Sequence, residues 1–349
     1  MKSMLRLILL LFFLLSTVSA SADSISYLDE EGTVKHADCV LLTDETDWGV
    51  PGDTRWYAAK GNVTISERIS IFGDVNLILT DGSVLSAKKG IDLCDGNRLS
   101  IWAQQQATGC LTAYGVNHAA GIGGSQYIRA ESLPNAGELI LYGGKIHAEG
   151  GDYAAGIGGA AGIGFGGKGG ALTVYGGQIE AVGGQYSAGI GGAQYADVYN
   201  QDETASGGSL LLIDGDVLAT GGRLGAGIGG GCCGPGGQIT ISNGTLEAIG
   251  GFGAPGIGSD RANAGTILIK GGSVVATGGE ASGIGGYGGG SLQIVEGTVM
   301  AKGIALGHGV GLSGGDITVK GGELIALGGD SISCGLSSHS LYVSAGSLK

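Results

Sequence analysis

A short motif, Ala-Gly-Ile-Gly-Gly, recurs along the chain and constrains its fold more than any other feature. With close variants, it places isoleucine at positions 122, 157, 190, 228, 257 and 284, and weaker copies place Val310 and Leu336 at the same point of the repeat. The spacing falls from 33–38 residues in the first copies to 26–29 in the later ones. Self-similarity at such periods is typical of solenoids, in which each unit packs against its neighbours.

Each repeat contains the same three pieces, and glycine closes each of them. In one copy these are Leu172–Tyr175, Gln178–Val182 and the motif itself at Ala188–Gly192. Period-two alternation is typical of strands, and it places Ile179 on the opposite face from Glu180. We therefore expect an all-β, right-handed parallel β-helix of about nine or ten three-strand coils, with the apolar faces sharing one core.

Glycine excludes several other fold classes. The chain has 77 glycines in 349 residues, and 67 of them follow residue 115. Because a glycine inside a helix costs about 1 kcal/mol relative to alanine, a helical bundle or helix-rich α/β enzyme is excluded. Units of 26 residues also leave no room for the helical crossovers of a doubly wound sheet. Collagen is excluded because glycine does not occupy every third position and there are only 4 prolines.

The first 22 residues have the pattern of a secretory signal peptide. Lys2 and Arg6 precede an apolar run at Leu7–Leu15, and Ala20–Ala22 is a small-residue cleavage site. The apolar run is shorter than the ~20 residues that a spanning helix needs. We therefore expect a secreted or surface-associated protein with no membrane span after signal cleavage.

The remaining chain is predicted to have two parts. Residues 23–60 lack the alternation and are expected to cap the rod, whereas residues 61–349 are expected to form the β-helix, with recognisable repeats from about residue 99. A further unit starts at Leu341, and the sequence stops within its second strand. Solenoids normally end in an atypical capping unit, so this pattern suggests either a shortened gene product or a last coil that pairs with a partner.

Charge and cysteine content exclude other functions. The formal net charge is −13, and without Lys2 and Arg6 it becomes −15, from 16 basic and 31 acidic residues. An acidic chain without basic clusters argues against nucleic acid and anionic membranes as partners. Cys94 and Cys110 are close enough in sequence to pair, whereas the adjacent Cys232 and Cys233 would bridge only with strain. None of the 6 cysteines has zinc-site spacing, so we expect no metal and no cofactor.

Most of the chain after the signal peptide resembles a known group of proteins. The segment Tyr27–Glu30, the pair Trp56-Tyr57, the block Gly61–Ile91 and the repeats are similar to glycine-rich, pectate-lyase-like β-helix proteins exported by anaerobic bacteria. Those proteins are often labelled carbohydrate-binding. The resemblance implies an exported protein that contacts glycans, and it supplies no catalytic motif to carry over.

Repeat length varies at one place only, between the glycine motif and the next first strand. Such insertions project from one edge of a solenoid, which is often the binding edge. Tyrosines gather in the same half of the chain, and a tyrosine offers a sugar ring both an apolar face and a hydroxyl. The predicted ligand-binding residues are Tyr127, Arg129, Tyr142, Tyr153, Tyr175, Tyr186, Tyr195, Asp197 and Tyr199. The alternative is that stacked tyrosines only stabilise the sheets.

A second column of residues follows the alternation. The position of Glu180 and Glu247 becomes apolar in other coils, as Leu218, Val275, Met300 and Ile325. If this column faces outward, as we expect, the later coils carry an apolar stripe that a partner protein would fit.

Catalytic residues are sparse. Hydrolysis of a glycosidic bond needs two carboxylates at a controlled separation, and elimination needs a basic side chain close to acidic groups. The weak candidates are Asp214, Asp216 and Arg223, and Asp214–Asp216 also suits a polar turn. The sequence thus favours a non-enzymatic adhesin or glycan-binding module whose partner is a polysaccharide, a host or cell-surface glycan, or another surface protein. A polysaccharide lyase or glycoside hydrolase and a passive structural spacer are the alternatives.

Overall fold

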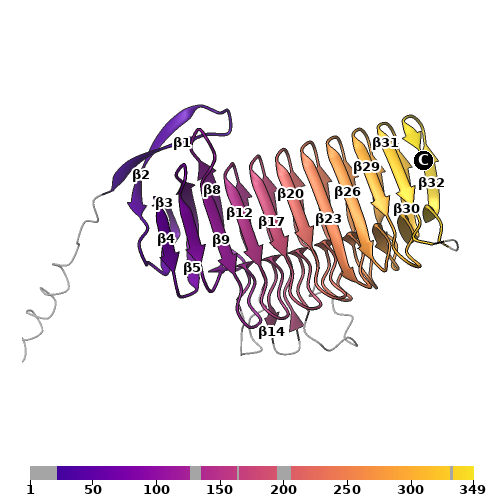
Figure 1. Ribbon diagram of the computed structural model, residues 1–349, viewed down its shortest axis with the longest axis horizontal. Coiled ribbons are helices and arrows are strands. Elements are labelled where there is room, and N and C mark those ends of the chain that lie inside the picture. Colours follow the sequence, from indigo (N-terminus) through magenta and orange to yellow (C-terminus); the bar gives the residue numbers. More distant parts are fainter. Residues whose placement is uncertain (1–21, 126–134, 163–164, 195–205, 331–332) are drawn as a thin grey trace, which may run out of the picture.

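The computed structural model describes residues 22–125, 135–162, 165–194, 206–330 and 333–349, which form one elongated rod of β-strands (Figure 1). The predicted all-β, right-handed parallel β-helix is confirmed. The described residues contain no α-helix, and therefore no apolar helix long enough to span a membrane.

The middle side of each coil belongs to one sheet of eleven parallel strands. Figure 1 shows them side by side, from β4 at the indigo end to β31 near the yellow end. Eleven strands mean one or two coils more than the predicted nine or ten. They are β4 (Asn62–Ile65), β6 (Val84–Ala87), β9 (Cys110–Tyr114), β12 (Lys145–Glu149), β17 (Gln178–Val182), β20 (Asp216–Thr220), β23 (Thr245–Phe252), β26 (Ser273–Gly279), β29 (Thr298–Lys302), β31 (Glu323–Leu327) and β33 (Ser347–Leu348).

A second sheet of twenty strands contains the other two sides of the coils. The first side consists of β8 (Arg98–Ala103), β11 (Glu138–Leu141), β16 (Ala171–Val174), β19 (Ser209–Leu212), β22 (Gln238–Ile241), β25 (Thr266–Ile269) and β28 (Ser291–Ile294). The third side begins with β7 (Ile91–Asp92) and then carries the glycine motifs in β10 (Ile122–Gly123), β13 (Ile157–Gly158), β18 (Ile190–Gly191), β21 (Ile228–Gly229), β24 (Ile257–Gly258) and β27 (Ile284–Gly286). Four longer strands bend through the corner between these sides, namely β3 (Asp47–Ala59), β5 (Ile69–Leu79), β30 (Val310–Val319) and β32 (Leu336–Val343).

Apolar side chains at equivalent positions of successive coils form ladders inside the rod. Ile146, Ile179 and Val217 are direct register partners and are at most 3% exposed. The motif isoleucines pair in the same way, Ile157 with Ile190 for example. Each such buried side chain stabilises the fold by about 1.5–3 kcal/mol. The predicted alternation is confirmed, since Ile179 is buried and Glu180 is exposed.

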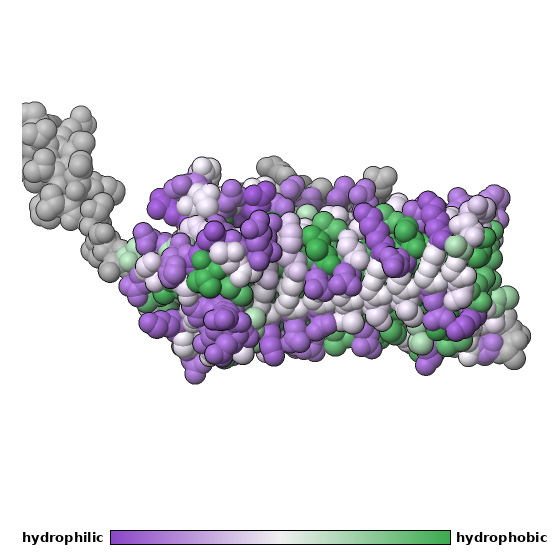
Figure 2. All heavy atoms as spheres, turned by 90° about the horizontal axis from the view of Figure 1, so that it is seen from above, coloured by the Kyte–Doolittle hydropathy of each residue, from purple (hydrophilic) through white to green (hydrophobic). Residues whose placement is uncertain are grey.

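The N-terminal strands cover the outside of the first coils. β1 (Asp23–Leu28) and β2 (Val34–Leu41) form an antiparallel hairpin that reaches over the rod in Figure 1. Tyr27 of β1 packs against Trp56 and Trp102, with ring centroids 4.9 and 5.1 Å away. Seen from above, hydrophilic residues cover much of this end, whereas the middle and far end show separate hydrophobic patches (Figure 2).

The structure corrects the pairing considered for Cys94 and Cys110. No disulfide joins any of the six cysteines, all of which lie among the described residues. Cys94 follows β7 on the third side of its coil and its Sγ donates to Asp92 Oδ1 at 2.8 Å, whereas Cys110 begins β9 on the middle side. The two residues are close in sequence and lie on different sides of the solenoid.

Candidate functional site

A long polar groove of about 890 Å³ follows the edge of the rod where the insertions occur. We call it the loop-edge groove. Two inserted strands, β14 (Ala161–Gly162) and β15 (Phe165–Gly166), lie along the same lower edge in Figure 1. The polar lining of the loop-edge groove consists of Asp74, Asp95, Asn97, Arg98, Asn135, Glu138, Lys168, Ser206, Ser209, Gln238, Asn263 and Thr266.

Its floor is a column of register partners at the starts of the first-side strands. The column runs Asp74, Arg98, Glu138, Ala171, Ser209, Gln238 and Thr266. With ~4.8 Å between neighbouring strands, these seven positions extend over about 29 Å. Ser209, Gln238 and Thr266 are exposed, so hydrogen-bonding groups are repeated at a regular interval along the groove.

Three asparagines shape this edge by bonding to the backbone. The Oδ1 atom of Asn97 accepts a hydrogen bond from Gly73 N at 2.8 Å, that of Asn135 from Lys168 N at 2.9 Å, and that of Asn263 from Gly265 N at 2.7 Å. The Asn263 bond, two residues along the chain, fixes a turn, whereas the bonds of Asn97 and Asn135 join neighbouring coils. These amides therefore hold the groove in shape, and the exposed groups of its floor are the ones that a ligand would meet.

The loop-edge groove is nearly neutral in charge. Arg98 Nε contacts Glu138 Oε2 at 2.6 Å, so these two side chains compensate each other. The other charged groups of the lining are the ammonium of Lys168, which is exposed, and the carboxylates of Asp74 and Asp95. A polar, nearly uncharged groove suits an elongated ligand that is rich in hydroxyl groups.

A second, smaller groove of about 520 Å³ lies on the outer face of the eleven-stranded sheet. Here His147 of β12 bridges two carboxylates, with Nε2 at 2.8 Å from Glu149 Oε1 and Nδ1 at 3.0 Å from Glu180 Oε2. Partial burial disfavours the imidazolium, but the hydrogen bonds to Glu149 and Glu180 outweigh it and raise the pKa of His147. Sequence analysis missed this cluster because its members come from two adjacent strands and share no motif.

The column of Glu180 faces outward on this sheet, as predicted. Leu218, Val275, Met300 and Ile325 are all partly exposed on the outside of the rod. They belong to one line of register partners, in which Glu180 precedes Leu218 and Glu247 lies between Leu218 and Val275. The later coils therefore carry a partly apolar outer face.

The tyrosine pairs predicted from equivalent positions do form stacks. Tyr142 and Tyr175 have ring centroids 4.8 Å apart and an interplanar angle of 16°, and Trp102 extends the stack with its centroid 3.7 Å from Tyr142. The Tyr142 hydroxyl donates to Glu30 Oε1 at 3.0 Å. Burial, and then this carboxylate, raise the pKa of Tyr142. The ring face of Tyr142 is therefore occupied by its neighbours.

A second stack forms at another corner of the coils. Tyr153 lies between His118 and Tyr186, with centroids at 5.2 and 5.9 Å and nearly parallel rings. Its ring faces are also directed at neighbouring rings, so a ligand would reach edges and hydroxyls. The other predicted contacts, Tyr127, Arg129, Tyr195, Asp197 and Tyr199, lie outside the described residues.

The weak catalytic candidates are not assembled into one site. Asp214 lies in the turn before β20 and Asp216 begins that strand, and both are exposed. Asn243 Nδ2 donates to Asp214 at 3.3 Å, and the Thr245 hydroxyl donates to Asp216. Arg223 follows the other end of β20, and the strand alone separates it from Asp216 by about 13 Å at 3.3 Å per residue. The arrangement is that of a hydrogen-bonded polar turn.

One group of potential metal ligands occurs among the described residues. Cys232, Cys233 and Asp260 are all buried and lie close together. The sequence did not suggest it because the aspartate belongs to the following coil, and no short motif spans that separation.

Comparison with known proteins supports the fold. A family model described as a beta helix repeat matches residues 172–194, 214–232 and 239–261. The chain is similar to beta-helix repeat proteins. The three matched stretches lie in successive repeats and include β17, β20 and β23. No curated protein and no solved structure matches the chain.

Proposed function

We propose that this chain is a non-catalytic carbohydrate-binding protein of the cell exterior that holds an uncharged polysaccharide along the loop-edge groove. The observation that carries the proposal is the floor of that groove: six of its seven positions, spaced by one strand over about 29 Å, are polar, and the neighbouring Ser209, Gln238 and Thr266 are exposed. A linear glycan presents hydroxyl groups along its length and can bond to several coils together.

Charge narrows the class of glycan. The chain has a formal net charge of −13, and the groove offers no excess of cationic groups. A polyuronate would be repelled by such a protein, since like charges raise the cost of association. Neutral glycans, or glycans with amino sugars, are therefore the proposed ligands, and attachment to a surface is the proposed role.

The test is retention of the full chain on a panel of neutral, amino-sugar and uronic-acid polysaccharides. The double variant Gln238→Ala, Thr266→Ala should weaken retention by about 10-fold, equivalent to ~1.4 kcal/mol. Gln293→Ala is the matched control, because Gln293 is also partly exposed on the first side of a coil but does not line the groove. Equal retention of the double variant and the wild type would overturn the assignment of the groove.

A second candidate function rests on the His147 cluster. Two carboxylates, Glu149 and Glu180, flank one imidazole on a grooved face, and enzymes that hydrolyse glycosidic bonds use paired carboxylates as acid and base. The same retention assays, scored for new reducing ends, separate the two functions. New reducing ends that form with the wild type and disappear in Glu180→Gln would establish hydrolysis. Retention of the protein without new reducing ends would support the proposal of a non-catalytic binding protein.

A further inference from the structure

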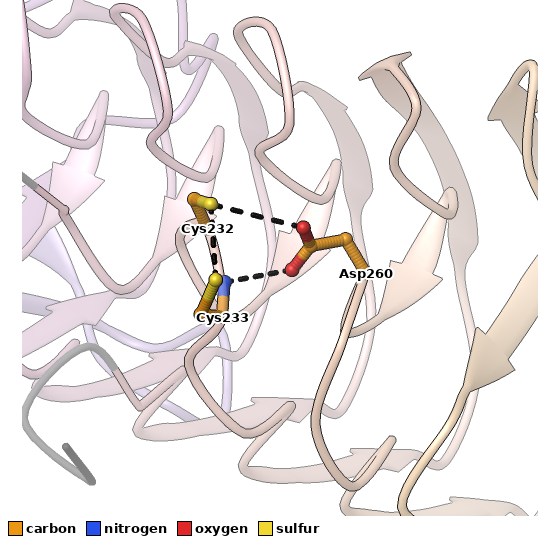
Figure 3. A group of neighbouring side chains, drawn as sticks. All are labelled: Cys232, Cys233 and Asp260. Atoms are coloured by element: carbon orange, nitrogen blue, oxygen red, sulfur yellow. Dashed lines mark hydrogen bonds between the residues drawn. The ribbon is translucent and has the colours of Figure 1, made fainter. Parts of the chain in front are cut away.

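Two adjacent cysteines meet a buried aspartate from the next coil (Figure 3). Cys232 and Cys233 lie in the turn after β21, and Asp260 lies in the corresponding turn after β24. Their exposed fractions are 0%, 5% and 6%. The two Sγ atoms are 3.3 Å apart, and Cys232 Sγ lies 3.8 Å from Asp260 Oδ2.

The composition of this turn is itself informative. Residues 229–237 read Gly-Gly-Gly-Cys-Cys-Gly-Pro-Gly-Gly, so the only two side chains beyond glycine and proline are thiols. Cys233 has a φ of +67°, a left-handed conformation that costs a non-glycine residue free energy. At position 233 the turn therefore has a cysteine where glycine would fit the backbone better.

The carboxylate is held in a fixed orientation. Cys233 N donates to Asp260 Oδ1 at 2.7 Å, which directs Oδ2 towards Cys232, as Figure 3 shows. The Arg261 guanidinium is mainly exposed, and its Nε is 3.7 Å from Oδ2, longer than a hydrogen bond.

The spacing of the three ligand atoms suits a tetrahedral metal ion. With Zn–S of about 2.3 Å and Zn–O of about 2.1 Å, tetrahedral ligand atoms are about 3.6–3.8 Å apart. The observed separations of 3.3 and 3.8 Å are close to this, and all three atoms lie within 4.8 Å of one another. Thiolates select borderline and soft cations over magnesium or calcium.

We propose that Cys232, Cys233 and Asp260 bind a thiophilic divalent transition-metal ion of the zinc type, leaving a fourth position for water. Such an ion would offset two of the three negative charges on the buried carboxylate and the two thiolates. It would also tie two neighbouring coils together, since its ligands come from the turns after β21 and β24. The metal-site proposal does not depend on the glycan groove, although Pro235 and Asn263 of the same two turns line that groove.

The test uses the full chain, stripped with a chelator and kept reduced with a phosphine. Cobalt(II) is the spectroscopic probe, because thiolate ligands produce a charge-transfer absorption, and zinc should then displace it. We expect one equivalent bound per chain. We also expect the melting temperature to rise with zinc, because a ligand that binds only the folded state stabilises it.

Three variants make the result decisive. Cys232→Ser with Cys233→Ser should abolish the cobalt absorption and the thermal shift. Asp260→Asn retains an acceptor for Cys233 N and should bind at least ~10-fold more weakly. Cys334→Ser removes an exposed cysteine outside the cluster and should bind as the wild type does. No stoichiometric binding by the reduced wild type, or binding that survives the double serine substitution, would overturn the site.

Discussion

The carbonyl oxygen of Gly191 occupies the space that a β-carbon on Gly158 would need. The two glycines are register partners in adjacent coils, and both have positive φ, +141° and +137°. The same relationship links Gly191 to Gly229 and Gly229 to Gly258. Glycine therefore recurs at this position of the repeat because the backbones of adjacent coils approach each other too closely for a β-carbon.

Gly158→Ala should therefore destabilise the rod strongly. Backbone strain alone costs about 1–3 kcal/mol, and the overlap with Gly191 forces neighbouring coils apart. Gly82→Ala is the control, because Gly82 also has positive φ, +72°, but a β-carbon there meets no atom within 4 Å. Urea denaturation should show a much larger loss for Gly158→Ala, and equal losses would contradict the steric explanation.

Arg68 should be a major source of stability in the first coils. Burial lowers the pKa of its guanidinium to about 10, so it remains charged at neutral pH. It donates to the Ser125 hydroxyl and to five backbone carbonyl groups, those of Lys89, Ile91, Ala120, Gly123 and Gly124.

Arg68→Met should lower the free energy of unfolding by about 2–4 kcal/mol, because several carbonyl groups lose a charged donor. Arg55→Met removes an exposed arginine that pairs with Asp53, and it should change stability by no more than ~0.5 kcal/mol. Thermal denaturation monitored by circular dichroism measures both. A similar, small effect of the two substitutions would show that the Arg68 bonds add little.

The His147 cluster should make stability depend on pH. The pKa of His147 is raised in the folded chain, so its charged form contributes stability that is fully present below the ordinary value of 6.5. This contribution is lost as pH rises through the raised pKa. His147→Gln should therefore lower the melting temperature more at pH 6 than at pH 9. His36→Gln, which removes an exposed histidine on β2, should show no such difference.

Tyr142 should stabilise the N-terminal hairpin through its ring more than through its hydroxyl. Tyr142→Phe keeps the stack with Trp102 and loses only the bond to Glu30, at a cost of about 0.5–1.5 kcal/mol. Tyr142→Ala also loses the stack and should cost about 1–3 kcal/mol more. Limited proteolysis at Lys35 of β2 should be faster in the alanine variant. Equal cleavage in both variants would mean that the stack does not hold the hairpin.

The cysteine pair and His147 show why the sequence predicted the fold but not these two side-chain clusters. Cys232 and Cys233 meet Asp260 only because adjacent coils align their turns, although the chain places the aspartate 27 residues after Cys233. His147 meets Glu180 for the same reason, across neighbouring strands of one sheet. A search for short spacings in the sequence cannot detect ligands that are one coil apart when coil length varies.

The repeat in the sequence was enough to predict a chain that winds into a parallel β-helix. It also predicted that Ile179 faces the core, that Glu180 faces outward and that the insertions share one edge. These properties follow from local alternation and from glycine at each corner, and both can be read along the chain. The tertiary structure alone decided which insertions and strand starts form one groove, that Tyr142 is enclosed between Trp102 and Tyr175, and that Cys232 faces Asp260. Those outcomes depend on the register between coils, which sets distances between residues that the sequence leaves far apart.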